Sequence, residues 1–225
     1  MESVIRLKHL NNWHGEKTMK LVLVRNAEHI GEQKIFWADK TVSLSKAGKG
    51  QAKLVCKRLE KEKPSAIYSS EYARAVETIK PLAEKLGLEI LQRSAFNAFD
   101  MGRYSGRTQD ETIEALGKEV WKEMVTRPDP NKRYFEGGET LAEEAERAWK
   151  GLQEILRKHA PEDAVVISTH LTIIGSLLCR IYNVSLSNIW LWGGSMAAEH
   201  PSITIIVHDN GRWYLQHYGC AEHLR

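Results

Sequence analysis

Short runs of Val, Ile and Leu alternate along the chain with longer stretches in which apolar residues recur at helical spacing. Six runs have the length and composition of strands that are buried on both faces of a sheet. These runs are Lys20–Val24, Ser65–Tyr68, Leu88–Leu91, Ala164–Ile167, Ser202–His208 and Trp213–Tyr218. Helical periodicity follows Ser45, follows Thr140 and covers Leu171–Tyr182. The alternation predicts an α/β fold, a three-layer α/β/α sandwich around a mostly parallel open sheet.

Local signals refine this prediction. Ser45 is a good N-cap, and Thr140 with Glu143 three residues later forms a capping box. The turn Asp209-Asn210-Gly211 suits the positive φ angles of a tight hairpin, so we expect an antiparallel edge strand. No composition shift marks a boundary beyond residue 19. We therefore predict one domain, 19–225, after an N-terminal extension, 1–18, that is either species-specific or non-native.

Composition and charge exclude several classes of protein. The 225 residues are 42% hydrophobic and 27% charged, as in one ordinary globular domain. The net charge of +3 gives no general case for nucleic acid or an anionic membrane. No apolar run approaches the ~20 residues that span a bilayer. Three widely spaced cysteines predict reduced thiols and a cytoplasmic location, and the histidines lack metal-ligand spacing. We expect neither a metal nor a cofactor.

Three candidate binding residues follow predicted strands. Arg25 follows the first strand, His170 follows the run that begins at Ala164, and Arg74 stands where a strand gives way to a helix. Ligands of open α/β sheets bind beyond the carboxyl ends of the strands. Two guanidinium groups and an imidazole gathered there would suit a phosphoryl group, because arginine donors match phosphate oxygens.

Five segments around these residues occur in one order along the chain. They are Arg25-Asn26-Ala27-Glu28, Leu44–Ala52, Ser69–Thr78, Gly137–Thr140 with a later Arg147, and His170 before a long apolar helix. In this order they resemble the motifs of the histidine phosphatase superfamily, which includes the cofactor-dependent phosphoglycerate mutases. The resemblance runs from about Met19 to the C-terminus.

The resemblance implies a two-step phosphoryl transfer. A histidine attacks phosphorus, a carboxylic acid protonates the leaving oxygen, and water or a second hydroxyl then takes the phosphoryl group from the phosphohistidine. Arg25, Arg74 and His170 would hold the phosphoryl oxygens. Only about 30 residues separate Gly106 from Gly137, which favours a phosphatase over a mutase. The expected ligand is phosphate or a small phosphorylated molecule.

Two residues depart from the family pattern. Asn26 stands at the position of the nucleophilic histidine, and its amide cannot attack phosphorus, although it can donate a hydrogen bond to a phosphate oxygen. Ala98 stands where the family commonly has a glutamate. Loss of a nucleophile lowers kcat by a factor on the order of 10⁶, and loss of a general acid lowers the reaction rate by a factor of ~10²–10⁴. Asp100 is the nearest spare carboxylate, with a solvated or capping role as its alternative, and Glu28 and Asp110 are weaker substitutes.

The sequence therefore predicts a phosphomonoesterase that works through a phosphohistidine, with this chain inactive or severely impaired. One alternative is a non-catalytic, phospholigand-binding pseudophosphatase, and another is a phosphoglycerate mutase-type phosphotransferase. Whether Asn26 and Ala98 are natural or introduced stays open.

Further residues have two interpretations each. A basic rim around the site or a solvated charged surface would account for Arg103, Arg107, Lys132 and Arg133. Aromatic residues could line the site's mouth or fill a core; these are Phe36, Trp37, Tyr104, Tyr134 and Phe135. The stretch Trp190–Gly194 could support a homodimer or pack within the chain.

Overall fold

The computed structural model describes residues 18–31, 39–193 and 200–225. The predicted extension 1–18 lies outside the described residues except for Thr18, and so do Phe36, Trp37 and Gly194. The strands are β1 (Met19–Arg25), β2 (Ala66–Ser69), β3 (Ile90–Gln92), β4 (Ala164–Thr169), β5 (Ile203–Asp209) and β6 (Arg212–Cys220). The α-helices are α1 (Lys46–Leu59), α2 (Ala73–Leu86), α3 (Gln109–Leu116), α4 (Lys118–Thr126), α5 (Leu141–Lys158), α6 (Leu171–Ile181) and α7 (Trp190–Gly193).

The six strands form one sheet in the order β3-β2-β4-β1-β5-β6. The first four run parallel, and β5 runs antiparallel to both β1 and β6. The predicted hairpin joins β5 to β6 through Asn210 and Gly211, whose φ angles are 48° and 78°. The mostly parallel sheet with an antiparallel edge is therefore confirmed.

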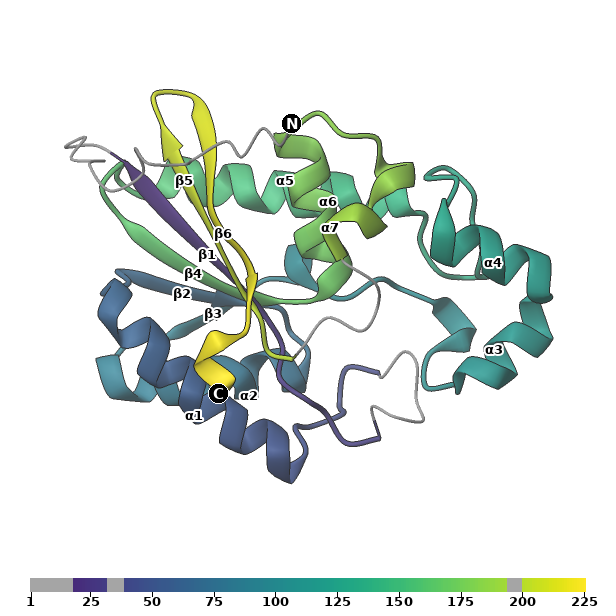
Figure 1. The fold of residues 1–225 in the computed structure, drawn as a ribbon, viewed down its shortest axis with the longest axis horizontal. Helices are drawn as coiled ribbons and strands as arrows, with labels where there is room; N and C mark the ends of the chain where they lie inside the picture. Colours follow the sequence, from purple (N-terminus) through teal and green to yellow (C-terminus); the bar gives the residue numbers. More distant parts are fainter. Residues whose placement is uncertain (1–17, 32–38, 194–199) are drawn as a thin grey trace, which may run out of the picture.

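Helices cover both faces of this sheet, with α1 and α2 on one side and α5 and α6 on the other (Figure 1). The alternating side chains of β1 show why. Leu21 and Leu23 belong to the cluster under α5 and α6, whereas Val22 and Val24 belong to the cluster under α1 and α2. Because successive side chains of a strand point to opposite faces, a continuous apolar run requires two helical layers.

Both predicted helix starts are confirmed. The Ser45 hydroxyl accepts a hydrogen bond of 3.0 Å from the backbone N–H of Gly48. Thr140 and Glu143 form the reciprocal capping box at the start of α5, with N···O distances of 2.7 and 3.2 Å. Each cap satisfies backbone donors that the first helical turn leaves without intrahelical acceptors.

Helices α3 and α4 extend beyond the sheet and enclose a small core of their own (Figure 1). Phe135 is fully buried there, and Tyr134 and Trp121 are nearly so. Tyr134 and Phe135 therefore fill a core. Along the chain, this lobe precedes the loop that contains Gly137 and the start of α5.

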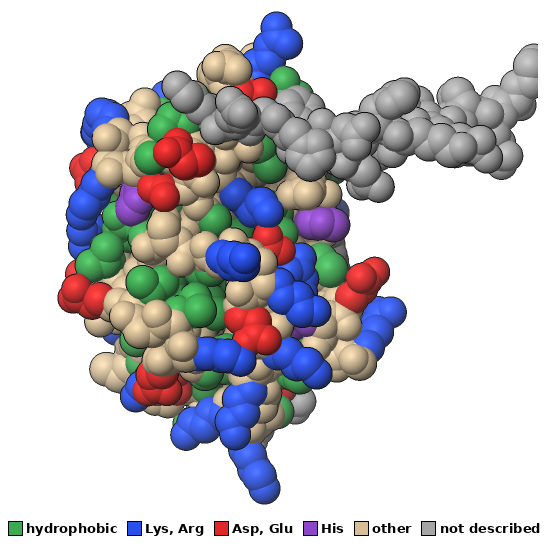
Figure 2. Space-filling model, turned by 90° about the vertical axis from the view of Figure 1, so that its left-hand side faces the viewer, with side chains coloured by type: hydrophobic (Ala, Val, Ile, Leu, Met, Phe, Trp, Pro, Cys, Tyr) green, Lys and Arg blue, Asp and Glu red, His purple; other side chains and the backbone are tan. Residues whose placement is uncertain are grey.

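The end of the molecule at the left of Figure 1 carries charges of both signs, interspersed as Figure 2 shows. Ion pairs among the described residues include Lys20–Glu62 at 2.8 Å and Arg58–Glu62 at 2.6 Å. Within the described ranges, no helix combines the length and apolar character that crossing a bilayer requires.

Candidate active site

Strand pairing brings the ends of β1 and β4 together. Arg25 lies opposite Thr169, and the backbone N–H of Asn26 donates to the Thr169 carbonyl at 2.9 Å. His170 follows at once as the N-cap of α6. Arg25, Asn26 and His170 are buried, with 5–6% of their surface exposed. The crossover between parallel strands thus places an arginine and an imidazole at one edge of the sheet, as predicted.

Arg74 joins this group from the first turn of α2. Its guanidinium lies over the ring of Tyr72, 4.6 Å from the centroid, and donates to the Asp39 carbonyl at 2.9 Å. The Tyr72 ring in turn meets His170 edge-on, with 5.1 Å between ring centroids. The structure therefore brings together the three residues expected to hold a phosphoryl group.

Hydrogen bonds assign the protons of His170. The Asn26 Nδ2 donates to the Ala27 carbonyl at 3.0 Å, which orients the amide and turns Oδ1 toward His170. Because Oδ1 only accepts, the contact of 3.0 Å requires a proton on His170 Nδ1. Its Nε2 lies 2.9 Å from the Ser70 hydroxyl, which can donate to it. The ring is thereby held between two partners.

His170 is neutral in this arrangement. Burial lowers its pKa well below the ordinary value, and the positive charges of Arg74, Arg147 and Arg25 lower it further, with a contribution from His29. The cluster thus gathers cations around an uncharged imidazole. The net positive charge of this cluster favours binding of an anion.

An ion pair between Arg147 and Glu139 lies beside the segment that contains Ala98 and anchors it. Arg147 on α5 binds Glu139 through two contacts of 2.6 and 2.9 Å, and donates to the Ala95 and Ala98 carbonyls at 2.9 and 3.2 Å. Ala98 itself is 8% exposed. Arg147 therefore holds in place the backbone of Ala98, the residue expected at the family's acid position.

Two of the three candidate substitute acids, Asp100 and Glu28, accept hydrogen bonds from other groups. Asp100 is exposed, and its Oδ1 accepts from the Gly102 N–H at 2.8 Å. Glu28 accepts from the Ser45 hydroxyl at 2.5 Å. Asp110 lies exposed in the first turn of α3. The capping interpretation of Asp100 is therefore the one that the geometry favours.

The predicted basic rim is largely paired with carboxylates. Arg103 pairs with Glu136, Lys132 lies 2.6 Å from Glu123, and Arg133 lies 2.7 Å from Glu143. Arg107 stacks over Tyr104 at 4.8 Å. These contacts favour the interpretation of a solvated charged surface.

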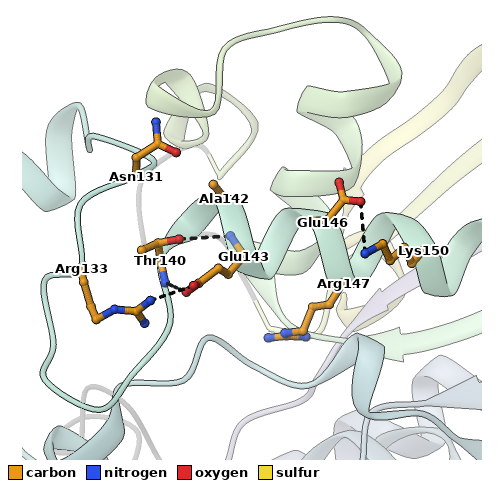
Figure 3. Close-up of a pocket in the computed structure, with 8 residues that line it drawn as sticks. All are labelled: Asn131, Arg133, Thr140, Ala142, Glu143, Glu146, Arg147 and Lys150. Carbon is orange, nitrogen blue, oxygen red and sulfur yellow. Dashed lines mark hydrogen bonds and ion pairs between the residues drawn. The ribbon is translucent and has the colours of Figure 1, made fainter.

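A separate pocket of about 600 Å³ opens beside the N-terminal half of α5 (Figure 3). Its lining residues are Asn131, Arg133, Thr140, Ala142, Glu143, Glu146, Arg147 and Lys150. Arg133 pairs with Glu143, Arg147 with Glu139, and Lys150 with Glu146 at 3.5 Å. Because its cationic side chains are paired with carboxylates and it is open to solvent, this pocket is a weaker candidate anion site than the buried cluster.

One residue at the cluster had no predicted role. His200 contacts the side chain of Arg25, and its Nδ1 lies 3.0 Å from the Asn26 carbonyl oxygen. The sequence signal was only its place just before the predicted strand Ser202–His208. In the structure this strand, β5, pairs with β1 in the opposite direction. The start of such a strand lies at the same sheet edge as the ends of the parallel strands. Within the described ranges, no group of three or more His, Cys, Asp or Glu side chains gathers as a metal ion would require.

Comparison with known proteins gives consistent matches. Residues 21–221 match the family model described as histidine phosphatase superfamily (branch 1). Phosphoserine phosphatase 1 of Hydrogenobacter thermophilus is 33% identical over 201 residues, which cover 86% of this chain and 89% of that protein. Phosphoglycerate mutase-like protein 4 of Arabidopsis thaliana is 31% identical over 222 residues, which cover 91% of this chain and 86% of that protein. The structure of YhfR from Bacillus stearothermophilus superposes with a TM-score of 0.82 at 24% identity, over 92% of this chain and 100% of that one.

Proposed function

Because this chain belongs to the histidine phosphatase superfamily (branch 1), we propose that it is a phosphomonoesterase scaffold that binds a small phosphomonoester at Arg25, Arg74 and His170. The supporting observation is the convergence of two buried guanidinium groups and a neutral imidazole at one edge of the sheet. Phosphoryl transfer depends mostly on positioning and on stabilising charge, and this group of residues suits both needs.

In our proposal the phosphohistidine route is lost in this chain. The amide at Asn26 has its nitrogen lone pair delocalised into the carbonyl, so it forms no bond to phosphorus. Its Nδ2 carries two N–H groups, of which the Ala27 carbonyl takes one, and the other can donate to a phosphate oxygen. Asn26 would therefore bind the phosphoryl group without attacking it, and Ala98 provides no proton for the leaving oxygen. We expect hydrolysis to be absent or severely impaired.

Two measurements test this proposal. Calorimetry should detect binding of inorganic phosphate that is lost in Arg25→Ala and in Arg74→Ala, with Arg212→Ala at the β5–β6 turn as a control that binds normally. Asn26→His combined with Ala98→Glu should produce hydrolysis of an aryl phosphate. Phosphate binding without any gain of hydrolysis in the double variant would favour the pseudophosphatase, and no phosphate binding by the unaltered chain would reject the site.

A mutase-type transfer is the weaker candidate. The chain between Gly106 and Gly137 contains only α3, α4 and a loop, which leaves little extra structure for a second substrate. A phosphatase needs only water as the acceptor, and phosphoserine phosphatase 1 is among the relatives. A gain of mutase activity without hydrolysis in the reverted variant would reverse this preference.

A further inference from the structure

His200 reaches the candidate site through the antiparallel strand. Val24 of β1 pairs with Ile203 of β5, and the backbone N–H of Arg25 donates to the Ser202 carbonyl at 2.9 Å. The residues just before β5 are therefore held beside the end of β1. This backbone pairing places an imidazole next to an arginine that lies 175 positions earlier in the chain.

The two contacts of His200 determine where its proton lies. The Asn26 carbonyl only accepts, so the contact of 3.0 Å places a proton on Nδ1. The Arg25 guanidinium only donates, so the Nε2 that meets its Nη2 carries a lone pair. A neutral imidazole with this one tautomer satisfies both partners. The ring thus links the arginine side chain to the backbone of Asn26.

We propose that His200 is a positioning residue, which holds the Arg25 guanidinium in the orientation that binds phosphate. An arginine side chain has several rotatable bonds, and one that is not held loses affinity when it must become ordered around a ligand. His200 accepts from one terminal nitrogen and so fixes the plane in which the other donors of the guanidinium lie. This inference rests on the proposed phosphate site and adds to it a residue from the C-terminal part of the chain.

The test compares phosphate affinities measured by calorimetry in His200→Leu, which removes the acceptor, and His200→Gln, whose side-chain oxygen can accept from Arg25. We expect the leucine variant to bind inorganic phosphate about tenfold more weakly and the glutamine variant to recover most of that loss. His217→Ala is the matched control, because His217 is an exposed histidine in β6, the strand that pairs with β5. Thermal unfolding of each variant separates a loss of fold from a loss of affinity.

A second comparison asks whether His200 acts through Arg25. Arg25→Lys keeps a positive charge, but its ammonium lacks the planar fork that His200 orients. His200→Leu should therefore have little further effect on phosphate affinity when Arg25→Lys is already present. An equal loss in both backgrounds would make His200 an independent ligand and overturn the proposal.

The outcomes distinguish this inference from the proposed function. If the unaltered chain binds no phosphate, the proposed function fails. If it binds phosphate, loses it in Arg25→Ala and keeps it unchanged in a folded His200→Leu variant, only the positioning role fails. A glutamine variant as weak as the leucine variant would also count against that role.

Discussion

Asn26 Oδ1 and His170 Nδ1 lie 3.0 Å apart, so the residue that we propose to occupy the family's nucleophile position is hydrogen-bonded to the imidazole that follows the neighbouring strand. The contact requires a proton on Nδ1 and leaves Nε2 to the Ser70 hydroxyl. Asn26 therefore stabilises one tautomer of His170, and in our proposal it also replaces the nucleophile.

A negative charge at residue 26 should change this relationship. In Asn26→Asp the new carboxylate would face His170, raise its pKa and repel an incoming anion. We expect phosphate affinity to fall by at least about tenfold, measured by calorimetry, and the His170 resonance to titrate at higher pH. Asn131→Asp, in the pocket beside α5, is the control, and an equal loss of affinity there would show a general charge effect instead.

Anion binding should be coupled to proton uptake. His170 is neutral because burial and neighbouring cations lower its pKa, and a bound anion would raise that pKa. Binding of sulfate, whose charge is constant near neutrality, should therefore tighten as the pH falls and take up as much as about one proton per site. Calorimetry in buffers of different ionisation enthalpy measures the uptake, and zero uptake at every pH would exclude His170 as the titrating group.

Glu144 should make stability depend on pH. This carboxyl is fully buried on α5, accepts from Thr172 at 2.6 Å and from Ser176 at 3.1 Å, and has a pKa raised by burial from 4.5 to about 7. A carboxyl with a raised pKa in the folded state favours folding at low pH. That contribution is lost as the pH rises from about 4.5 to about 7.

The variant Glu144→Gln should remove this dependence. Relative to the variant, the unaltered chain should lose up to about 3 kcal/mol of unfolding free energy between pH 4.5 and pH 8. Urea denaturation across that range measures the difference. Glu146→Gln, a more exposed position on the same helix, should leave the profile unchanged, and identical profiles for all three proteins would contradict the expectation.

Two glycines of α1 should respond oppositely to alanine. A Cβ at Gly48 would lie 2.0 Å from the Glu28 carbonyl oxygen, whereas a Cβ at Gly50 would meet nothing within 4 Å. Gly48→Ala should push away the segment that follows Asn26, destabilise the fold and weaken phosphate binding. Gly50→Ala should stabilise the helix by about 0.5–1 kcal/mol. Denaturant unfolding compares the stabilities of the two variants. An unchanged free energy of unfolding in Gly48→Ala would show that this segment can shift without destabilising the fold.

Removing Arg147 should loosen the backbone at Ala98. The side chain is part of a largely buried pair with Glu139, and its loss leaves that carboxylate uncompensated, at a cost of about 3–5 kcal/mol. Arg147→Met tests this by chemical denaturation. Arg133→Ala breaks a more exposed pair and should cost much less. Equal losses in the two variants would mean that the Arg147 network contributes little.

Local chemistry predicted much of this fold. The caps at Ser45 and Thr140 and the Asn210-Gly211 turn depend on residues close in sequence, so their signals survive without tertiary information. Each predicted strand end lies within two residues of the observed one. The order of the strands was not readable, because pairing between distant segments depends on global packing.

The candidate site was predictable where it followed parallel strands. Arg25, Arg74 and His170 stand just after such strands, and the structure brings them together. The contact between His200 and Arg25 depends on β5 lying beside β1 in the opposite direction. Burial of Glu144 likewise depends on which face of α5 packs against α6, and the nearby Glu143, Glu146 and Arg147 gave no sign of it.

The antiparallel placement of β5 also bears on biosynthesis. Arg25 leaves the ribosome 175 residues before its neighbour His200. The hairpin of β5 and β6 must dock against β1 before the two side chains can meet. A nascent chain that ends before β5 would therefore contain Arg25 without the contact that we propose to position it.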